Sequence, residues 1–285
     1  MKKIESVKEW GGWLNRYTHA STSCHCEMTF SVYLPPQAEQ APVPAIYWLS
    51  GLTCSDDNFR TKAGAQRYAA EQGVALIIPD TSPRGDDVAD ASERYDLGKG
   101  AGFYVNATRM PWAKHYHMYA YITDELPALI EAEFPVMPGV KSIMGHSMGG
   151  HGALIIALKN PQAYRYVSAF SPICHPLKCG WGEGCFSVYL GDDKKQWESW
   201  DATCLVQQGA TVPEILIDQG TGDEFLAEQL YPNDLQAACE EKGLNLTLRF
   251  QDGYDHSYHF IGSFIGEHIQ RHAQALKRLT PTSND

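Results

Sequence analysis

Short apolar runs alternate along this chain with segments of helical spacing. Residues 45–49 and 74–78 are continuous apolar runs, the form taken by strands that are buried on both faces. Residues 28–34 alternate apolar and polar positions, as a half-buried strand does. Between the two continuous runs, residues 61–72 are rich in Ala and long polar residues and end at Gly73, which predicts a helix. Strands that alternate with helices in this way predict an α/β fold with a mainly parallel central sheet and helices on both faces.

The same alternation continues to the end of the chain. Further strands are predicted at residues 140–144, 214–218 and 246–250, and further helices at 149–159, 226–242 and 257–279. Residues 115–134 also have apolar positions at helical spacing, with Pro127 as a kink or boundary. Residues 81–102 are rich in Gly and Asp and show no clear period, so we expect a surface loop there, close to an active site.

Composition and charge exclude several classes of protein. The chain has 285 residues, 44% of them apolar, and no Pro/Ser-rich linker or charge block, so we expect a single domain over residues 1–285. Its net charge of −11 has the wrong sign for binding nucleic acid or an anionic membrane. No apolar run approaches the ~18 residues of a membrane-spanning helix, and the first ten residues mix both charges where a signal peptide is apolar. We therefore expect a cytoplasmic protein.

Metals, cofactors and disulfides are not indicated either. The eight cysteines lack paired C-x-x-C spacing, and we expect most of them to be reduced thiols. Two histidine pairs, His115 with His117 and His256 with His259, invite a metal interpretation, but no H-E-x-x-H motif is present. Residues 98–102 have the Gly content of a phosphate loop but lack its spacing and its setting between strand and helix. We therefore expect no cofactor and no metal.

A candidate nucleophile lies in the sequence Gly-His-Ser-Met-Gly at residues 145–149, which fits G-x-S-x-G. The motif falls where a predicted strand passes into an Ala- and Gly-rich predicted helix. In that setting a strained turn lifts the serine hydroxyl above the sheet, and small neighbours let strand and helix approach. The alternative is that Ser147 merely caps the helix. The strand-turn-helix setting favours Ser147 as the nucleophile of an α/β-hydrolase fold.

The acid and the base of such a fold follow the serine in the order Asp or Glu, then His. Asp223 lies in a Gly-rich turn after a predicted strand and is our candidate acid, with Asp218 and Glu224 as alternatives. His256 follows the next predicted strand and precedes the last helix, which makes it the candidate base. His259 is the alternative, but it lies one turn into an amphipathic helix, where a packed or surface role is commoner.

The oxyanion hole and the substrate pocket are predicted from neighbouring positions. One N–H donor comes from Met148, the residue after the nucleophile, and the second from Leu52, in the loop after residues 45–49. A plain strand-to-loop turn at Leu52 is the alternative. His146, and Trp181 from a Cys- and Gly-rich loop, are candidates for a pocket that admits only a small acyl group. Cys54 is expected either at the mouth of this pocket, as a modulating thiol, or as a buried apolar residue.

Several of these segments together resemble the S-formylglutathione hydrolase family, also called the esterase D family. They are S-G-L-T-C at residues 50–54, G-A-G-F-Y at 100–104, G-H-S-M-G-G-H-G-A at 145–153, I-D-Q-G at 217–220 and G-Y-D-H-S-Y at 253–258. The resemblance implies a cofactor-independent thioesterase that converts S-formylglutathione to formate and glutathione in formaldehyde detoxification, with side activity on short esters. It also implies the triad Ser147, Asp223 and His256, and a homodimer or larger homo-oligomer.

Other functions use the same residues. A short-chain carboxylesterase or an acyltransferase employs the same triad, whereas a binding protein with a decayed site is disfavoured by the complete Ser, Asp and His set. Glutathione carries two carboxylates, so a glutathione thioester is expected to meet local positive charge. The candidates are Arg60, Lys62, Lys114 and Lys178, each of which is otherwise a solvated surface charge.

Overall fold

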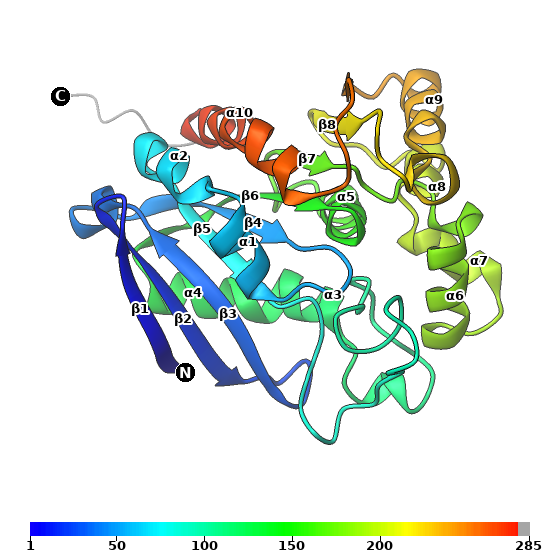
Figure 1. The fold of residues 1–285 in the computed structure, drawn as a ribbon, viewed down its shortest axis with the longest axis horizontal. Coiled ribbons are helices and arrows are strands. Elements are labelled where there is room, and N and C mark those ends of the chain that lie inside the picture. The colour runs from blue at the N-terminus through cyan, green and yellow to red at the C-terminus, as the bar shows by residue number, and fades with distance from the viewer. Residues whose placement is uncertain (279–285) are drawn as a thin grey trace.

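A sheet of nine strands runs through the protein, which we describe from a computed structural model covering residues 1–278 (Figure 1). The strand order is β1-β2-β3-β5-β4-β6-β7-β8-β9. The pairs from β1 to β5 are antiparallel, and those from β5 through β4 to β9 are parallel, so the predicted mainly parallel sheet is confirmed. The strands are β1 (Lys2–Glu9), β2 (Gly12–Ala20), β3 (Glu27–Leu34), β4 (Val43–Leu49), β5 (Ala75–Pro79), β6 (Val136–His146), β7 (Val167–Phe170), β8 (Ile215–Gly220) and β9 (Leu246–Gln251).

Helices cover both faces of the sheet, because the central strands bury side chains in both directions. In β4, Ile46 and Trp48 belong to the apolar core formed with α1, α2 and α10, whereas Tyr47 and Leu49 belong to the core on the other face, to which α4, α5, α8 and α9 contribute. No helix of the described part of the chain is both long and apolar enough to cross a membrane. The helices are α1 (Asp56–Lys62), α2 (Ala65–Gln72), α3 (Met118–Ala120), α4 (Leu126–Glu133), α5 (Met148–Lys159), α6 (Gly180–Tyr189), α7 (Lys194–Trp197), α8 (Ala202–Gln207), α9 (Pro232–Lys242) and α10 (Tyr258–Lys277).

Two helices that the periodicity predicted as continuous are broken. The helix predicted at 61–72 is two helices, because Ser55 caps α1 earlier and Gly64 takes a left-handed φ of 66° between α1 and α2. The helix predicted at 226–242 starts as a π-helical segment and is interrupted at Tyr231, whose φ is 50°, before Pro232 opens α9. Both breaks are backbone turns that leave the apolar spacing largely intact, which is why the pattern did not show them.

The segment predicted as helical at 115–134 contains a π-helical turn, Tyr121–Glu125, between α3 and α4. Pro127 lies in the first turn of α4, directly after this π-helical turn, so it marks the boundary between the two helical forms. Residues 81–102 contain no helix or strand, as predicted. The last predicted helix is α10, and its predicted end at residue 279 lies outside the described residues. The pattern missed β1, β2 and β7; β1 is largely exposed and charged, and β7 has only four residues.

Candidate active site

Ser147 lies in a tight turn between β6 and α5, with φ 57° and ψ −118°. A positive φ is rare for a residue with a side chain and marks local strain, which packing must hold in place. The Ser147 N–H donates to the Phe170 carbonyl at 3.0 Å. A Cβ on Gly145 would lie 2.2 Å from the Gly149 carbonyl oxygen, and one on Gly149 would lie 1.9 Å from the Leu49 oxygen. Only glycine fits these two positions, so the motif's glycines permit the turn that presents the serine hydroxyl.

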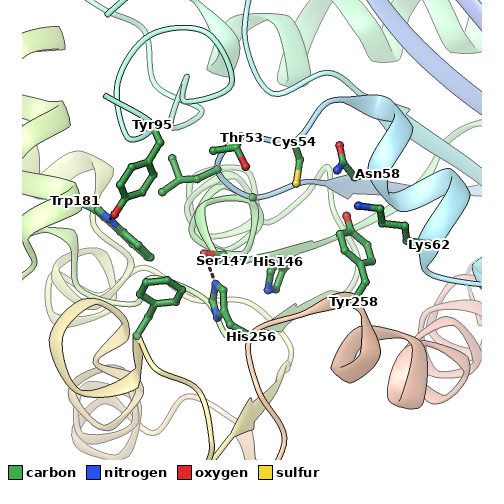
Figure 2. A pocket seen from close by; sticks show the side chains of 13 residues that line it. Thr53, Cys54, Asn58, Lys62, Tyr95, His146, Ser147, Trp181, His256 and Tyr258 are labelled. Carbon is green, nitrogen blue, oxygen red and sulfur yellow. Dashed lines mark hydrogen bonds between the residues drawn. The ribbon is translucent and has the colours of Figure 1, made fainter. Parts of the chain in front are cut away.

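The side chain of His256 bridges Ser147 and Asp223 (Figure 2 shows the bond to Ser147). Its Nε2 lies 2.9 Å from Ser147 Oγ, and its Nδ1 lies 2.5 Å from Asp223 Oδ2. An ionised carboxylate only accepts hydrogen bonds, so Nδ1 carries a proton and Nε2 is free to accept one from the serine hydroxyl. This is the arrangement in which a histidine acts as general base towards a serine.

The carboxylate of Asp223 is buried and held by several donors. Burial alone would raise its pKa, but the His256 ring and the Phe225 N–H, 2.9 Å from Oδ1, bring the pKa below the usual aspartate value. The side-chain amide of Gln219 also donates to Oδ2 at 3.2 Å. Asp223 therefore stays ionised at neutral pH and fixes the tautomer of His256. Glu224 and His259, two of the alternatives, are exposed and do not line the pocket.

Asp218, the remaining alternative acid, belongs to a separate buried network. Arg249 donates to its carboxylate through Nε at 2.7 Å and Nη2 at 2.6 Å, and His268 Nε2 lies 2.9 Å away. Beyond His268, hydrogen bonds continue through Ser168 to His272 inside the protein. Burial opposes ionisation of Asp218, but these donors hold its pKa far below the usual value. The network fastens α10 to the sheet below the active site and does not reach the nucleophile.

The two predicted oxyanion donors lie beside the nucleophile. Met148 opens α5, and the first N–H groups of a helix have no partner within it. The Leu52 N–H makes no hydrogen bond to another described residue, and Leu52 lines the cavity at Ser147. The loop that carries Leu52 is held from outside, because Tyr104 donates its hydroxyl to the Ser50 carbonyl at 2.8 Å and the Thr53 N–H donates to the Gly100 carbonyl at 2.9 Å. Gly100, within the Gly-rich residues 98–102, therefore braces this loop, and a Cβ at Gly100 would lie 3.2 Å from Thr53 Cα.

A cavity of about 360 Å³ opens at Ser147 and contains the predicted pocket residues Cys54, His146 and Trp181. The prediction that Trp181 lies in a loop was wrong. Trp181 lies in the first turn of α6, which Cys179 caps with its sulfur. The cavity lining that the sequence did not single out comprises Thr53, Asn58, Tyr95 and Phe225.

The two sides of this cavity differ in chemistry (Figure 2). Tyr95 and Trp181 lie on one side, where the Trp181 Nε1–H donates to the Tyr95 hydroxyl at 2.9 Å and the Trp181 ring packs 4.7 Å from that of Phe225. We call these three residues the aromatic wall. Asn58, Lys62 and Tyr258 lie on the opposite side of Ser147 and are called the polar wall.

Two residues between the walls have no charge at neutral pH. His146 is buried 4.5 Å from the His256 ring, between ring centroids, and both its ring nitrogens lack hydrogen-bond partners among the described residues. Burial and the neighbouring His256 keep its pKa well below the usual histidine value. Burial also raises the pKa of the Cys54 thiol, although Lys62 and Arg84 counteract it. Neither group is therefore a base or a thiolate nucleophile at the site.

The histidine pair considered for a metal is occupied by backbone contacts. His115 Nδ1 lies 2.8 Å from the Cys24 carbonyl and His117 Nε2 lies 2.6 Å from the Ala113 carbonyl. Elsewhere, His175, Asp201 and Cys204 bring three potential metal ligands together. The Asp201 carboxylate already accepts the backbone N–H groups of Leu177 and Cys204, and this cluster does not line the cavity at Ser147.

Comparison with known proteins connects this geometry to a family. Residues 21–271 match the Esterase family model, described as "Putative esterase". The S-formylglutathione hydrolase of Mus musculus is 54% identical over 279 residues, which cover 97% of this chain and 99% of the mouse protein. An S-formylglutathione hydrolase from Agrobacterium tumefaciens is 47% identical with a TM-score of 0.96, covering 97% of this chain and 100% of that one. A ferulic acid esterase from Anaeromyces mucronatus, 18% identical with a TM-score of 0.66, covers 96% of this chain and 93% of its own. The predicted α/β-hydrolase fold is confirmed.

Proposed function

This chain belongs to the S-formylglutathione hydrolases of the esterase family, and we propose that it hydrolyses S-formylglutathione to formate and glutathione. The observation that carries the proposal is the hydrogen-bonded series Asp223, His256 and Ser147 on the floor of an open cavity. Relatives that bear this name are 47–54% identical to this chain over nearly its full length, which supports the choice of substrate. The reaction needs only a nucleophile, a base and an oxyanion hole, all of which this chain's own residues supply.

In the first half of the proposed reaction, His256 takes the proton from Ser147 as Oγ attacks the formyl carbon. The carbonyl oxygen becomes an oxyanion, which the N–H groups of Leu52 and Met148 stabilise. Asp223 stabilises the imidazolium that forms on His256. When the tetrahedral intermediate collapses, the carbon–sulfur bond breaks and His256 returns the proton to the leaving sulfur, so glutathione departs and a formyl ester remains on Ser147.

In the second half, water replaces glutathione. His256, again neutral, removes a proton from water as its oxygen attacks the formyl ester, and the same two N–H groups stabilise the second oxyanion. Collapse breaks the bond to Ser147 Oγ, which recovers its proton from His256 and releases formate. Each group is thereby restored to its starting state.

The aromatic wall supports a preference for a small acyl group. Trp181 and Phe225 pack against each other, and the Phe225 ring lies 5.0 Å from the His256 ring, between centroids. A formyl or acetyl group fits beside such a surface without moving it, whereas a longer chain displaces packed rings. Since apolar pockets discriminate by roughly 1–3 kcal/mol per methylene, the rate falls stepwise with acyl length.

The test is a kcat/KM series over acyl lengths on both glutathione and p-nitrophenol leaving groups. We expect the highest value for S-formylglutathione, weaker turnover of acetyl esters, and little turnover beyond about four acyl carbons. A preference for long acyl chains, or indifference to the glutathione moiety, would indicate a general carboxylesterase. Faster transfer of the acyl group to an added alcohol or thiol than to water would indicate an acyltransferase.

Location and assembly complete the proposal. The eight cysteines are free thiols in the structure, which supports a reducing, cytoplasmic compartment. Apolar side chains exposed along the first two strands support a homodimer or larger homo-oligomer. They are Ile4, Val7, Trp10 and Trp13, each more than 40% exposed. Light scattering on the purified protein tests the assembly, and a monomer at all concentrations would exclude it.

A further inference from the structure

The polar wall carries positive charge that nothing else in the described structure neutralises. Lys62 ends α1, is exposed and lines the cavity at Ser147. Its Nζ lies 5.9 Å from the centroid of the Tyr258 ring, and it forms no ion pair with an acidic residue among residues 1–278. The chain as a whole has a net charge of −11, which repels anions. A cation without an acidic partner at the cavity therefore provides local attraction for an anionic ligand.

The other cations considered from the sequence form ion pairs with acidic residues or lie away from the cavity. The buried Arg60 guanidinium pairs with Glu5 at 2.6 Å and with Asp57 at 2.8 Å. Lys178 binds Asp234 at 2.7 Å, and neither Lys178 nor Lys114 lines the cavity. Among these four candidates, only Lys62 is both free of an acidic partner in the described structure and positioned at the site.

Asn58, one turn before Lys62 on the same helix, adds a neutral donor. Its Oδ1 accepts the Ser55 N–H at 2.9 Å as part of the cap of α1, which fixes the amide orientation. Its Nδ2 consequently points away from the cap and donates to no other described residue. The Tyr258 hydroxyl is also buried; it lies near the side chains of Ser50 and Cys54 but makes no hydrogen bond of good geometry to a described residue. A buried polar group without a partner is costly, and a ligand that bonds it relieves that cost.

We propose that Lys62 and Asn58 form a carboxylate-binding subsite for the leaving thiol, with the Tyr258 hydroxyl as an additional donor. The inference rests on the proposed function, because it concerns the leaving group of that reaction. A glutathionyl group carries two carboxylates, an ammonium and two amides, which cannot be desolvated against the aromatic wall without lost hydrogen bonds. The polar wall satisfies them, so the leaving group lies towards Lys62 and the acyl group towards Trp181.

The test compares kcat/KM for S-formylglutathione with kcat/KM for p-nitrophenyl acetate, whose leaving group has no carboxylate. In Lys62→Gln we expect this ratio to fall about tenfold, the range of a charge-assisted hydrogen bond. Lys62→Arg retains the charge and restores most of the ratio. Lys178→Gln is the matched control, since it removes a surface lysine outside the cavity, and it keeps the wild-type ratio. Raising the salt concentration to about 1 M shortens the Debye length to about 3 Å and so weakens attraction between charges. It lowers the ratio in wild type more than in Lys62→Gln.

Two further substrates identify which carboxylate is bound. One is S-formylglutathione esterified at its glycyl carboxylate, and the other is S-formyl-N-acetylcysteinylglycine, in which an acetyl group replaces the γ-glutamyl residue and its carboxylate. The substrate that lacks the bound group is turned over about tenfold less well by wild type and responds little to Lys62→Gln.

The outcomes separate this subsite from the reaction itself. If wild type hydrolyses S-formylglutathione well but Lys62→Gln and Lys178→Gln have equal ratios, the subsite is refuted and the reaction stands. If wild type does not hydrolyse S-formylglutathione, the proposed function is refuted and the subsite with it.

Discussion

The same substitution, aspartate to asparagine, is expected to have different consequences at the two buried residues Asp223 and Asp218: it lowers activity at Asp223 and stability at Asp218. In Asp223→Asn the amide no longer demands a proton on His256 Nδ1, so the histidine loses its fixed tautomer and its stabilising charge. The analogous substitution in a serine protease lowers kcat by about 10⁴, and we expect a loss of that order here. The fold is expected to persist, because the single amide oxygen still accepts from the Phe225 N–H, and the bond from Gln219 that is lost is a long one, at 3.2 Å.

In Asp218→Asn the loss falls on stability. The carboxylate accepts two hydrogen bonds from Arg249, one from His268 and one from Gln251 at 3.1 Å. Breaking a buried ion pair costs about 3–5 kcal/mol. We expect about 3 kcal/mol, the lower end, because Arg249 is 25% exposed and keeps its bond to Glu267 at 2.7 Å. At about 2 °C per kcal/mol for a chain of this size, the melting temperature falls by roughly 6 °C.

The pH dependence of stability supplies a second measure of this substitution. Because the folded protein holds the pKa of Asp218 far below its unfolded value of about 3.9, its stabilisation is complete above that pH and is lost as the pH falls below it. The Asn variant lacks this contribution, so its melting temperature declines less steeply between about pH 5 and pH 2.

Melting temperatures by circular dichroism and kcat/KM per folded molecule decide between the two roles. We expect Asp218→Asn to melt lower but keep its activity within a few fold, and Asp223→Asn to keep its melting temperature but lose activity. An inactive Asp218→Asn with wild-type stability, together with an active Asp223→Asn, would refute the assignment of the acid.

Three further substitutions test other parts of the site. Tyr104→Phe removes the hydrogen bond to the Ser50 carbonyl and loosens the loop that carries Leu52, so kcat is expected to fall about tenfold with little change in KM; an unchanged kcat would show that the loop needs no such brace. Trp181→Ala opens the aromatic wall and is expected to raise kcat/KM for butyryl relative to acetyl p-nitrophenyl esters by about tenfold; an unchanged ratio would place the acyl group elsewhere. Cys54→Ser is expected to resist inhibition by bulky thiol reagents, which act on wild type faster as the pH rises above the usual cysteine range, because burial raises the pKa of this thiol; equal inhibition of both proteins would exclude Cys54 as the modified thiol.

The sequence predicted those candidate residues of the site that a local pattern encodes. The nucleophile turn has a recognisable setting because its glycines and its strand and helix are neighbours in the chain. The candidate acid and the candidate base follow from chain order, since each comes after a strand whose end lies at the same edge of the sheet. The geometry around Ser147 then joins residues 223 and 256 to it by hydrogen bonds.

The cavity walls were predicted only in part, since the sequence indicated Trp181 and Lys62 but not Tyr95, Phe225 or Asn58. Tyr95 lies in a segment without periodicity, and it reaches the site through a contact with Trp181, 86 residues later. Asn58 and Lys62 lie one turn apart on one short helix because α1 begins earlier than the pattern indicated, and both line the cavity at Ser147. Such contacts depend on how distant segments pack, and no local spacing records them.

The measurement that tests the central claim most directly is the release of formate and glutathione from S-formylglutathione by the purified protein and by Ser147→Ala. The account predicts rapid, stoichiometric release of both products by wild type. It predicts almost none by the variant, which should keep its melting temperature because it loses only a hydroxyl at the cavity floor. Release by Ser147→Ala at the wild-type rate, or no release by wild type, would contradict it.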